Sequence, residues 1–239
     1  MIIYGSHPCH HAIKNRAKDI QEIYTIKGHN SHVINNYLPE ILKRKIVYLS
    51  ENDFLKHVSN ATTHQNIAIK IDNKPYKNLE SLRNLGPNSV IAILDGIVDP
   101  QNLGTIIRNA AAMNVTHIIT QSKSSCHITP SAVKVASGGY EYVDMVSVTN
   151  ITQSIKQLKS YGYWTVAFDE TGEKNIFDIE MNGKICLIFG AEGTGIRRLV
   201  LDNSDFIVKI PTSSSFPTLN VSASVAIAFY ESMRQKLLN

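Results

Sequence analysis

The chain has little cysteine, one tryptophan and no long apolar run. Its 239 residues include Cys9, Cys126 and Cys186, an odd number of widely spaced cysteines without a C-x-x-C pair. This pattern speaks against a disulfide framework and a structural zinc site, and it fits a reducing compartment. No segment is apolar over the roughly 20 residues of a membrane helix, and the N-terminus has no run of signal-peptide length. We therefore expect a soluble, cytoplasmic protein that does not insert into a membrane.

One short cluster near the N-terminus suggests a metal site at first sight. It consists of His7, Cys9, His10 and His11. No second pair of ligands follows at zinc-site spacing, so we predict that the chain binds no metal. These residues are interpreted instead as the start of a helix.

The charge balance is mildly basic and does not identify a partner by itself. The chain carries 24 Lys and Arg against 20 Asp and Glu, which gives a net charge of +4. Nucleic-acid binding and ordinary metabolic chemistry are equally compatible with that balance. An apolar content of 43% is normal for a folded chain of this length.

Hydrophobic patterning divides the chain into a small N-terminal part, residues 1–72, a linker, residues 73–87, and a larger C-terminal part, residues 88–239. The linker is rich in Lys, Asn and Pro and includes a short helical stretch. In the N-terminal part the patterns predict helices over 13–24, 31–43 and 53–59, and strands over 45–49 and 67–71.

In the C-terminal part, apolar strands and amphipathic helices alternate. The predicted strands span 90–94, 117–120, 142–146, 164–168, 184–189 and 206–209, and the predicted helices span 102–113, 131–136, 151–161, 196–203 and 221–238. This alternation predicts an α/β fold with a mostly parallel sheet covered on both faces. The last helix carries an apolar stripe that fits a core face or, as a second possibility, a dimer seam. The stripe consists of Val221, Val225, Phe229 and Met233.

The first segment that carries chemistry leads from the strand at 90–94 into a helix with an arginine. Asp99-Pro100 ends the extended chain, because the residue before a proline avoids helical dihedral angles. Asn102 follows at or near the helix start, where its side chain can cap N–H groups or contact a ligand. Arg108 lies among isoleucines and alanines, where a guanidinium needs an anionic or carbonyl partner. A structural salt bridge and an anion-binding role both remain open.

Two further loops follow apolar strands. Residues 189–195 read F-G-A-E-G-T-G, and the glycines around Glu192 allow backbone groups to approach a flat ligand closely. This loop is neither a P-loop nor a G-x-G-x-x-G motif, and a plain tight turn remains possible. The third loop joins Ile210-Pro211 to the last helix, which begins near Asn220.

In this order, the three segments resemble the signature motifs of the SpoU (TrmH) family of RNA ribose 2′-O-methyltransferases. The match is closest to the RlmB branch, which methylates a guanosine of 23S ribosomal RNA. The resemblance is strong from Val90 onward and looser over the first seventy residues. Thr212, Ser214 and Thr218 stand where the family usually has Met, Gly and Ser, and Thr218 keeps the hydroxyl.

The resemblance implies S-adenosyl-L-methionine as cofactor and assigns roles to ten residues. The implied catalytic residues are Arg108, Asn102, Glu192, Asn220 and Thr218. The implied cofactor-binding residues are Gly190, Ile210 and Leu219, which would act through backbone atoms, together with Thr120 and Gly193.

The family's arginine, matched by Arg108, is thought to activate the ribose 2′-OH. Because a guanidinium loses its proton only above pH about 12, we favour an electrostatic stabiliser of the developing alkoxide. Residues 131–139 resemble a family segment near the mouth of the site, where Lys134 either meets RNA phosphate or is simply solvated.

For the whole chain, the resemblance implies a SPOUT-type fold whose C-terminal part forms a deep trefoil knot, preceded by an L30e-like RNA substrate-binding domain. It also implies a homodimer with the cofactor near the subunit interface. The N-terminal part would contact RNA phosphates through basic residues, namely Lys14, Arg16, Lys18 and Lys27. Two alternatives remain open: a tRNA ribose 2′-O-methyltransferase, and a catalytically silent RNA-binding protein of the same fold.

Overall fold

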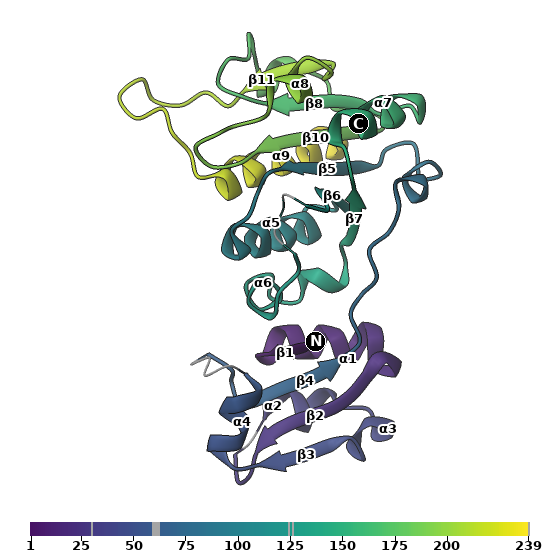
Figure 1. Cartoon of the computed structure of the whole chain (residues 1–239), viewed down its shortest axis with the longest axis vertical. Coiled ribbons are helices and arrows are strands. Elements are labelled where there is room, and N and C mark those ends of the chain that lie inside the picture. Colours follow the sequence, from purple (N-terminus) through teal and green to yellow (C-terminus); the bar gives the residue numbers. More distant parts are fainter. Residues whose placement is uncertain (30, 59–62, 124, 126, 239) are drawn as a thin grey trace.

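The computed structural model describes residues 1–29, 31–58, 63–123, 125 and 127–238, and it contains two sheets built from separate stretches of chain (Figure 1). Cys126 and the end of the predicted helix at 53–59 lie outside the described residues. The first sheet is mixed, with the order β1-β4-β2-β3 and parallel pairing between β2 and β3. Its strands are β1 (Ile2–Tyr4), β2 (Ile20–Ile26), β3 (Ile46–Leu49) and β4 (Ile67–Ile71). Its helices are α1 (Ser6–Arg16), α2 (His32–Tyr37), α3 (Glu40–Lys43) and α4 (Glu51–His57), with a 3-10 turn η1 (Ala17–Asp19) after α1.

The second sheet has seven strands in the order β7-β6-β5-β10-β8-β11-β9, and every pairing between them is parallel. Its strands are β5 (Val90–Asp95), β6 (His117–Gln121), β7 (Asp144–Val148), β8 (Trp164–Phe168), β9 (Lys174–Asn175), β10 (Ile185–Gly190) and β11 (Phe206–Lys209). The helices around it are α5 (Pro100–Ala112), α6 (Pro130–Val135), α7 (Ile151–Ser160), α8 (Arg198–Leu201) and α9 (Val221–Leu237), with 3-10 turns η2 (Leu79–Leu82), η3 (Gly139–Glu141) and η4 (Ile176–Asp178). The predicted α/β class with a mostly parallel sheet is confirmed.

Helices cover both faces of the parallel sheet because its central strands are apolar at nearly every position. Successive side chains of a strand point to opposite faces. Ala92 and Leu94 of β5 pack in one core with α5 and α9, whereas Ile91 and Ile93 pack in the other with α7 and α8. A strand buried on both faces reads as a continuous apolar run, which is why the sequence predicted this strand correctly.

The carboxyl ends of β5 and β10 lie side by side at the centre of the sheet, where Gly190 pairs with Asp95. The chain leaves β5 toward β6 and β7 on one side, then crosses to β8 and β11 on the other. In open parallel sheets, ligands bind at such a switch in strand order, outside the carboxyl ends. The topology therefore marks the edge that contains the loops after β5 and β10.

Two N-terminal predictions are wrong. The helix expected over 13–24 ends at Arg16, and Ile20–Ile26 forms the strand β2, because its isoleucines are buried by pairing with β4. The helix expected over 31–43 is two short helices. Leu38 takes extended dihedral angles (φ −83°, ψ 117°), as expected for a residue before a proline.

The segment between the two sheets packs along the edge strand β7 (Figure 1). Lys77 donates its backbone N–H to the carbonyl of Met145 at 2.8 Å, and Lys74 Nζ lies 2.7 Å from a carboxylate oxygen of Asp144. Leu79 and Leu82 are buried in the core with α7. This part of the chain is therefore an integral part of the larger sheet's packing.

The two regions meet where α1 and β1 face α6 and η3 (Figure 1). Arg16 forms a two-pronged ion pair with Glu141, with Nε–Oε2 at 2.7 Å and Nη2–Oε1 at 3.1 Å. His11 Nδ1 lies 2.9 Å from the hydroxyl of Tyr142. Arg16 is thus engaged in a contact that holds the two regions together. Within the described part of the chain, no helix has the length and apolar character to cross a membrane.

Candidate active site

The N-terminus of α5 is built by local capping. Asp99 accepts hydrogen bonds from the backbone N–H groups of Gln101 (3.0 Å) and Asn102 (3.4 Å), and Pro100 occupies the first helical turn, where a missing N–H costs nothing. The cap is therefore Asp99, and the amide side chain of Asn102 is free for another partner. Asn102 is only 8% exposed.

Residues from all three motif segments form one hydrogen-bonded group, here called the three-loop cluster: Asn102, Glu192 and Asn220. Asn102 donates from Nδ2 to Glu192 Oε2 at 3.2 Å, and Asn220 donates from Nδ2 to Glu192 Oε1 at 2.9 Å. Asn220 Nδ2 also lies 3.3 Å from Asn102 Oδ1. Both carboxylate oxygens of Glu192 are thus held by neutral amides, which fixes the carboxylate without neutralising its charge.

Asn220 also shapes the start of the last helix. It is the N-cap of α9, and its Oδ1 accepts from the backbone N–H of Ser222 at 2.9 Å and from the Ser222 hydroxyl at 2.5 Å. On α5, Asn109 Nδ2 lies 3.5 Å from the carbonyl of Ser222. The start of α9 is therefore tied to α5, and the amide of Asn220 is oriented toward Glu192.

The glycine loop after β10 folds tightly on itself. Ala191 and Gly195 exchange two backbone hydrogen bonds of 2.9 and 3.2 Å, and a Cβ on Gly190 would lie 2.1 Å from the carbonyl carbon of Gly195. Gly193 and Gly195 have φ of +86° and +64°, which favours glycine. The sequence suggested that the glycines allow a close approach to a ligand. In the structure they allow the loop to pack against its own backbone, and this tight fold places Glu192 at the turn.

An ion pair that the sequence analysis missed anchors this loop to β5. Asp95, 2% exposed at the end of β5, accepts from the backbone N–H and Nε of Arg197, both at 3.1 Å, and its other oxygen lies 2.7 Å from Arg197 Nη2. Arg197 also donates to Gln121 Oε1 at 2.9 Å. A carboxylate that ends an otherwise apolar strand was the available signal, because such a buried charge needs a partner.

The residues expected to bind the cofactor lie at the carboxyl edge of the parallel sheet. Thr120 is near the end of β6 and 4% exposed, Gly190 ends β10, and Ile210 follows β11 directly. Leu219 is 41% exposed in the segment 211–220, where Thr218 is exposed as well. Among the described residues, the backbone groups of Ile210 and Leu219 make no backbone hydrogen bonds, so they are available to a ligand.

Arg108 is not part of the three-loop cluster. It lies seven residues, about two turns, after Gln101 on α5, so these two side chains share a face that is adjacent to the face of Asn102 and Asn109. Arg108 is exposed, and within the described part of the chain its guanidinium makes no hydrogen bond or ion pair. The structural salt bridge that the sequence left open is therefore absent among these residues.

Arg108 lines a cavity of about 520 Å³ between the two regions, here called the junction cavity. Its wall includes His7 and Gln65 from the N-terminal region and Gln101, Arg108 and Lys134 from the C-terminal region. Lys134 is half-buried, and its Nζ lies 3.3 Å from Gln65 Oε1. With its partial burial and its contact to Gln65, Lys134 is not simply solvated, and the same burial lowers the pKa of its amine.

The N-terminal histidines have neighbours of another kind. His10 packs against the Tyr37 ring, with centroids 4.0 Å apart, and His11 bonds to Tyr142. Within the described ranges, no group of three His, Cys, Asp or Glu side chains is placed to hold a metal ion.

Comparisons with known proteins agree with this architecture. Residues 89–230 match the model of the SpoU rRNA Methylase family, and residues 2–77 match the model described as RNA 2'-O ribose methyltransferase substrate binding. The 23S rRNA (guanosine-2'-O-)-methyltransferase RlmB of Neisseria meningitidis is 33% identical over 99% of this chain and 96% of its own length. The protein of that name from Escherichia coli is 29% identical over 98% of each chain.

Solved structures share the fold. The SpoU methyltransferase AviRb from Streptomyces viridochromogenes, in complex with the cofactor AdoMet, superposes with a TM-score of 0.82 at 18% identity, covering 99% of this chain and 90% of that one. An rRNA methyltransferase from Sinorhizobium meliloti gives a TM-score of 0.79 at 19% identity, over 98% and 86% of the two chains. The two family models, the full-length relatives and the shared fold together place this chain in the SpoU rRNA methylase family.

Proposed function

We propose that the protein transfers a methyl group from S-adenosyl-L-methionine to the ribose 2′-OH of a guanosine in 23S ribosomal RNA. The observation that carries this proposal is the three-loop cluster, which joins all three motif segments at the sheet edge where α/β proteins bind ligands. The named full-length relatives support the RNA class and the nucleoside. A cytoplasmic location follows from the same proposal.

The residues at the carboxyl edge fit the cofactor. The backbone groups of Ile210 and Leu219 are available for the hydrogen bonds that an adenosine needs, and Gly190 lets the loop that follows it fold tightly beside them. We assign Gly193 and Thr120 to the wall of the same site. When bound, the cofactor supplies an electrophilic methyl group.

On the protein side, the reaction needs groups that orient the 2′-OH, accept its proton and stabilise the developing alkoxide. Glu192, held at both oxygens by Asn102 and Asn220, can accept a hydrogen bond from a hydroxyl. Thr218, two residues before Asn220, supplies a hydroxyl on the same segment. Arg108 carries the positive charge that an alkoxide or a neighbouring phosphate requires.

We also propose a homodimer, but its interface uses other residues of α9 than the apolar stripe that the sequence suggested. Phe229 is fully buried against Phe189 and belongs to the core, so it cannot hold a partner. The outward side of α9 instead presents Ile227 (39% exposed) and Tyr230 (55% exposed), which line an apolar groove with Phe177 (62% exposed). Exposed apolar surface of this kind marks an interaction site.

Mapping of ribose methylation in ribosomal RNA tests the proposed function. In a strain that lacks the gene, we expect one 2′-O-methylguanosine of 23S rRNA to be lost and to return with the wild-type gene. An intact 23S rRNA pattern together with a lost tRNA ribose methyl would favour the tRNA enzyme. An unchanged pattern in both RNAs would favour the catalytically silent RNA-binding protein.

A further inference from the structure

The junction cavity is positively charged and contains no acid in its described wall. Arg108, Lys134 and His7 line it, and no Asp or Glu belongs to its described lining. The described residues provide neither Arg108 nor Lys134 with a carboxylate partner within ion-pair distance. Lys134 is half-buried without a counter-charge among the described residues, so an anionic ligand would offset its desolvation, and the exposed Arg108 adds a second positive charge at the same cavity.

Lys134 is held in this cavity by features of the N-terminal region. A Cβ on Gly5 would lie 2.2 Å from Lys134 Nζ, so the end of the lysine side chain passes close to the backbone of Gly5, whose φ of +95° favours glycine. Gln65 Oε1, which accepts from Ser6 N–H at 2.8 Å, also lies 3.3 Å from Lys134 Nζ. Gln65 itself has a φ of +55°, a conformation that side chains other than glycine adopt rarely and that concentrates at functional sites.

The junction cavity and the three-loop cluster lie on adjacent faces of α5. Gln101 and Asn102 are consecutive on α5, but Gln101 lines the cavity while Asn102 bonds to Glu192. A helix with its side chains is about 10–12 Å wide. An anion in the cavity therefore lies within roughly one or two nucleotides of a ribose positioned at Glu192.

We propose that the junction cavity binds a backbone phosphate of the RNA next to the methylated nucleotide. Lys134 is the principal cation that binds this phosphate, and residues of both regions line the site. This inference rests on the proposed function. It also explains what the N-terminal region contributes, because Gly5 and Gln65 position Lys134 and the phosphate is bound only where both regions meet. Neighbouring hydroxyls of Ser131 and Ser137 complete the set of donors.

The test uses Lys134→Gln, with Lys156→Gln on the exposed face of α7 as the matched control. The probe is a synthetic 23S rRNA fragment that the wild-type protein methylates. We expect Lys134→Gln to bind this fragment about tenfold more weakly and to lower the slope of log affinity against log salt by about 1, with cofactor affinity unchanged. The control should match the wild type in all three measurements.

A series of fragments, each with one phosphate replaced by a neutral methylphosphonate, identifies the contact. At one position, the methylphosphonate should lower the RNA affinity of the wild type about tenfold. The same replacement should lower the affinity of Lys134→Gln less than about twofold, because the lysine charge that contacts this phosphate is already absent. If Lys134→Gln melts early, Ser137→Asp places an anion in the same wall at a φ of +52° that Asp tolerates, and it should weaken RNA binding at least about tenfold.

Unchanged affinity and salt slope in Lys134→Gln, or a methylphosphonate series in which no position distinguishes the two proteins, would overturn the inference. Failure of the proposed function would look different, because the wild-type protein would then methylate no 23S fragment at all.

Discussion

The two polar faces of α5 differ in whether their side chains have partners. On one face, Asn102 and Asn109 are engaged with Glu192 and with the start of α9. On the other face, Arg108 has no partner among the described residues, although it lines a cavity that also contains Lys134. A polar network in which every group is hydrogen-bonded fixes the orientation of its side chains, whereas an unpaired cation can bind an anionic ligand. We therefore assign the first face to positioning the reacting ribose and the second to the RNA backbone and the developing charge.

The largest effect is expected from Arg108→Ala. Removal of a group that stabilises transition-state charge should lower methyl transfer at least about 100-fold, about 2.7 kcal/mol, with cofactor affinity almost unchanged. Single-turnover transfer to 23S rRNA measures it, and Arg198→Ala, at an exposed arginine on α8, is the control. Turnover within about tenfold of wild type would make Arg108 dispensable and remove the difference between the two faces.

Glu192→Gln tests the satisfied face. The new amide nitrogen would meet the Nδ2 of Asn102 or Asn220, so donor faces donor and the cluster must rearrange. We expect a loss of roughly 10- to 100-fold in methyl transfer with RNA affinity retained. The pattern would be reversed, with RNA affinity lost and transfer to bound RNA intact, if Glu192 belonged to the RNA-binding side.

Asp95→Asn should loosen the loop that carries Glu192. Asparagine cannot replace the carboxylate that receives both the backbone and the guanidinium of Arg197. Because the Arg197 side chain is 53% exposed, we expect a loss of only about 1–3 kcal/mol of stability, together with weaker cofactor binding. Thermal unfolding and calorimetry measure the two effects. An unchanged cofactor affinity would show that the loop keeps its position without this ion pair.

The smallest effect on chemistry at the site itself is expected from Tyr230→Asp on the outward side of α9. A charge in an apolar interface should shift the protein to a monomer without lowering its melting temperature much, because Tyr230 is 55% exposed. Light scattering at micromolar concentration measures this change. A wild-type protein that is already monomeric at that concentration would contradict the proposed dimer.

How well the sequence predicted the fold depended on burial. The strands at 164–168 and 206–209 were predicted with their observed bounds, and β5 differed by one residue, because apolar runs between turn residues are unambiguous in a parallel sheet. Residues 20–24 of the strand β2 were misassigned, since the basic residues before them extended an apparent helical pattern into the strand. The strands β1 and β9, three and two residues long, carry too little pattern to be detected.

The candidate site was partly accessible from the sequence. The resemblance named Asn102, Glu192 and Asn220 together, and the structure places them in one hydrogen-bonded group. That Arg108 lines the junction cavity and lies outside the three-loop cluster could not be predicted, because this placement depends on which face of α5 the N-terminal region covers. The junction cavity depends on residues about 70 positions apart, and no local pattern encodes that contact. The trefoil knot implied by the family stays a prediction.

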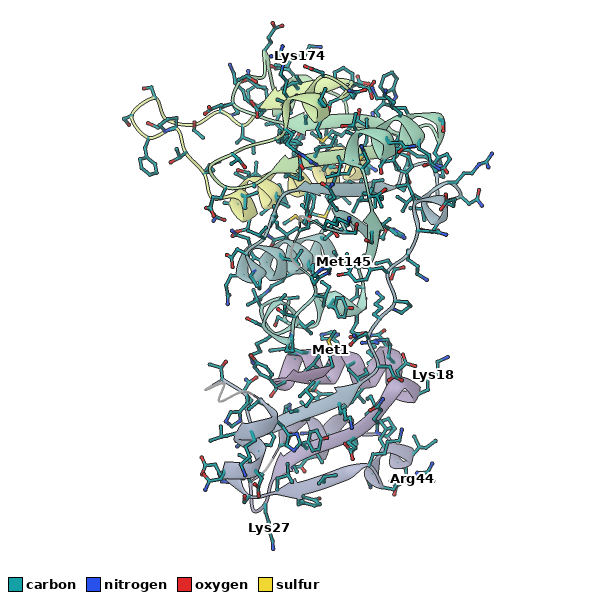
Figure 2. The ribbon with its side chains drawn as sticks, in the orientation of Figure 1. Met1, Lys18, Lys27, Arg44, Met145 and Lys174 are labelled. Atoms are coloured by element: carbon teal, nitrogen blue, oxygen red, sulfur yellow. The ribbon has the colours of Figure 1, made fainter. Side chains whose placement is uncertain are left out.

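The basic residues expected to contact RNA also could not be placed from the sequence alone. Arg16 is tied to Glu141 at the junction, and Figure 2 shows Lys18 near that junction but Lys27 at the far end of the N-terminal region. Lys18 and Lys27 therefore lie at different ends of this region. A count of basic residues therefore overestimates the RNA-binding surface, and the position of each residue relative to the cluster decides its role.

Methyl transfer by the purified protein with labelled S-adenosyl-L-methionine tests the central claim most directly. Transcripts of 23S rRNA, 16S rRNA and tRNA are offered in parallel, and digested nucleosides are identified by mass spectrometry. We predict label in 2′-O-methylguanosine from the 23S transcript alone, at a single position. Label in a base, label in tRNA, or no label in any RNA while the cofactor binds would contradict the claim that this protein methylates a ribose of 23S ribosomal RNA.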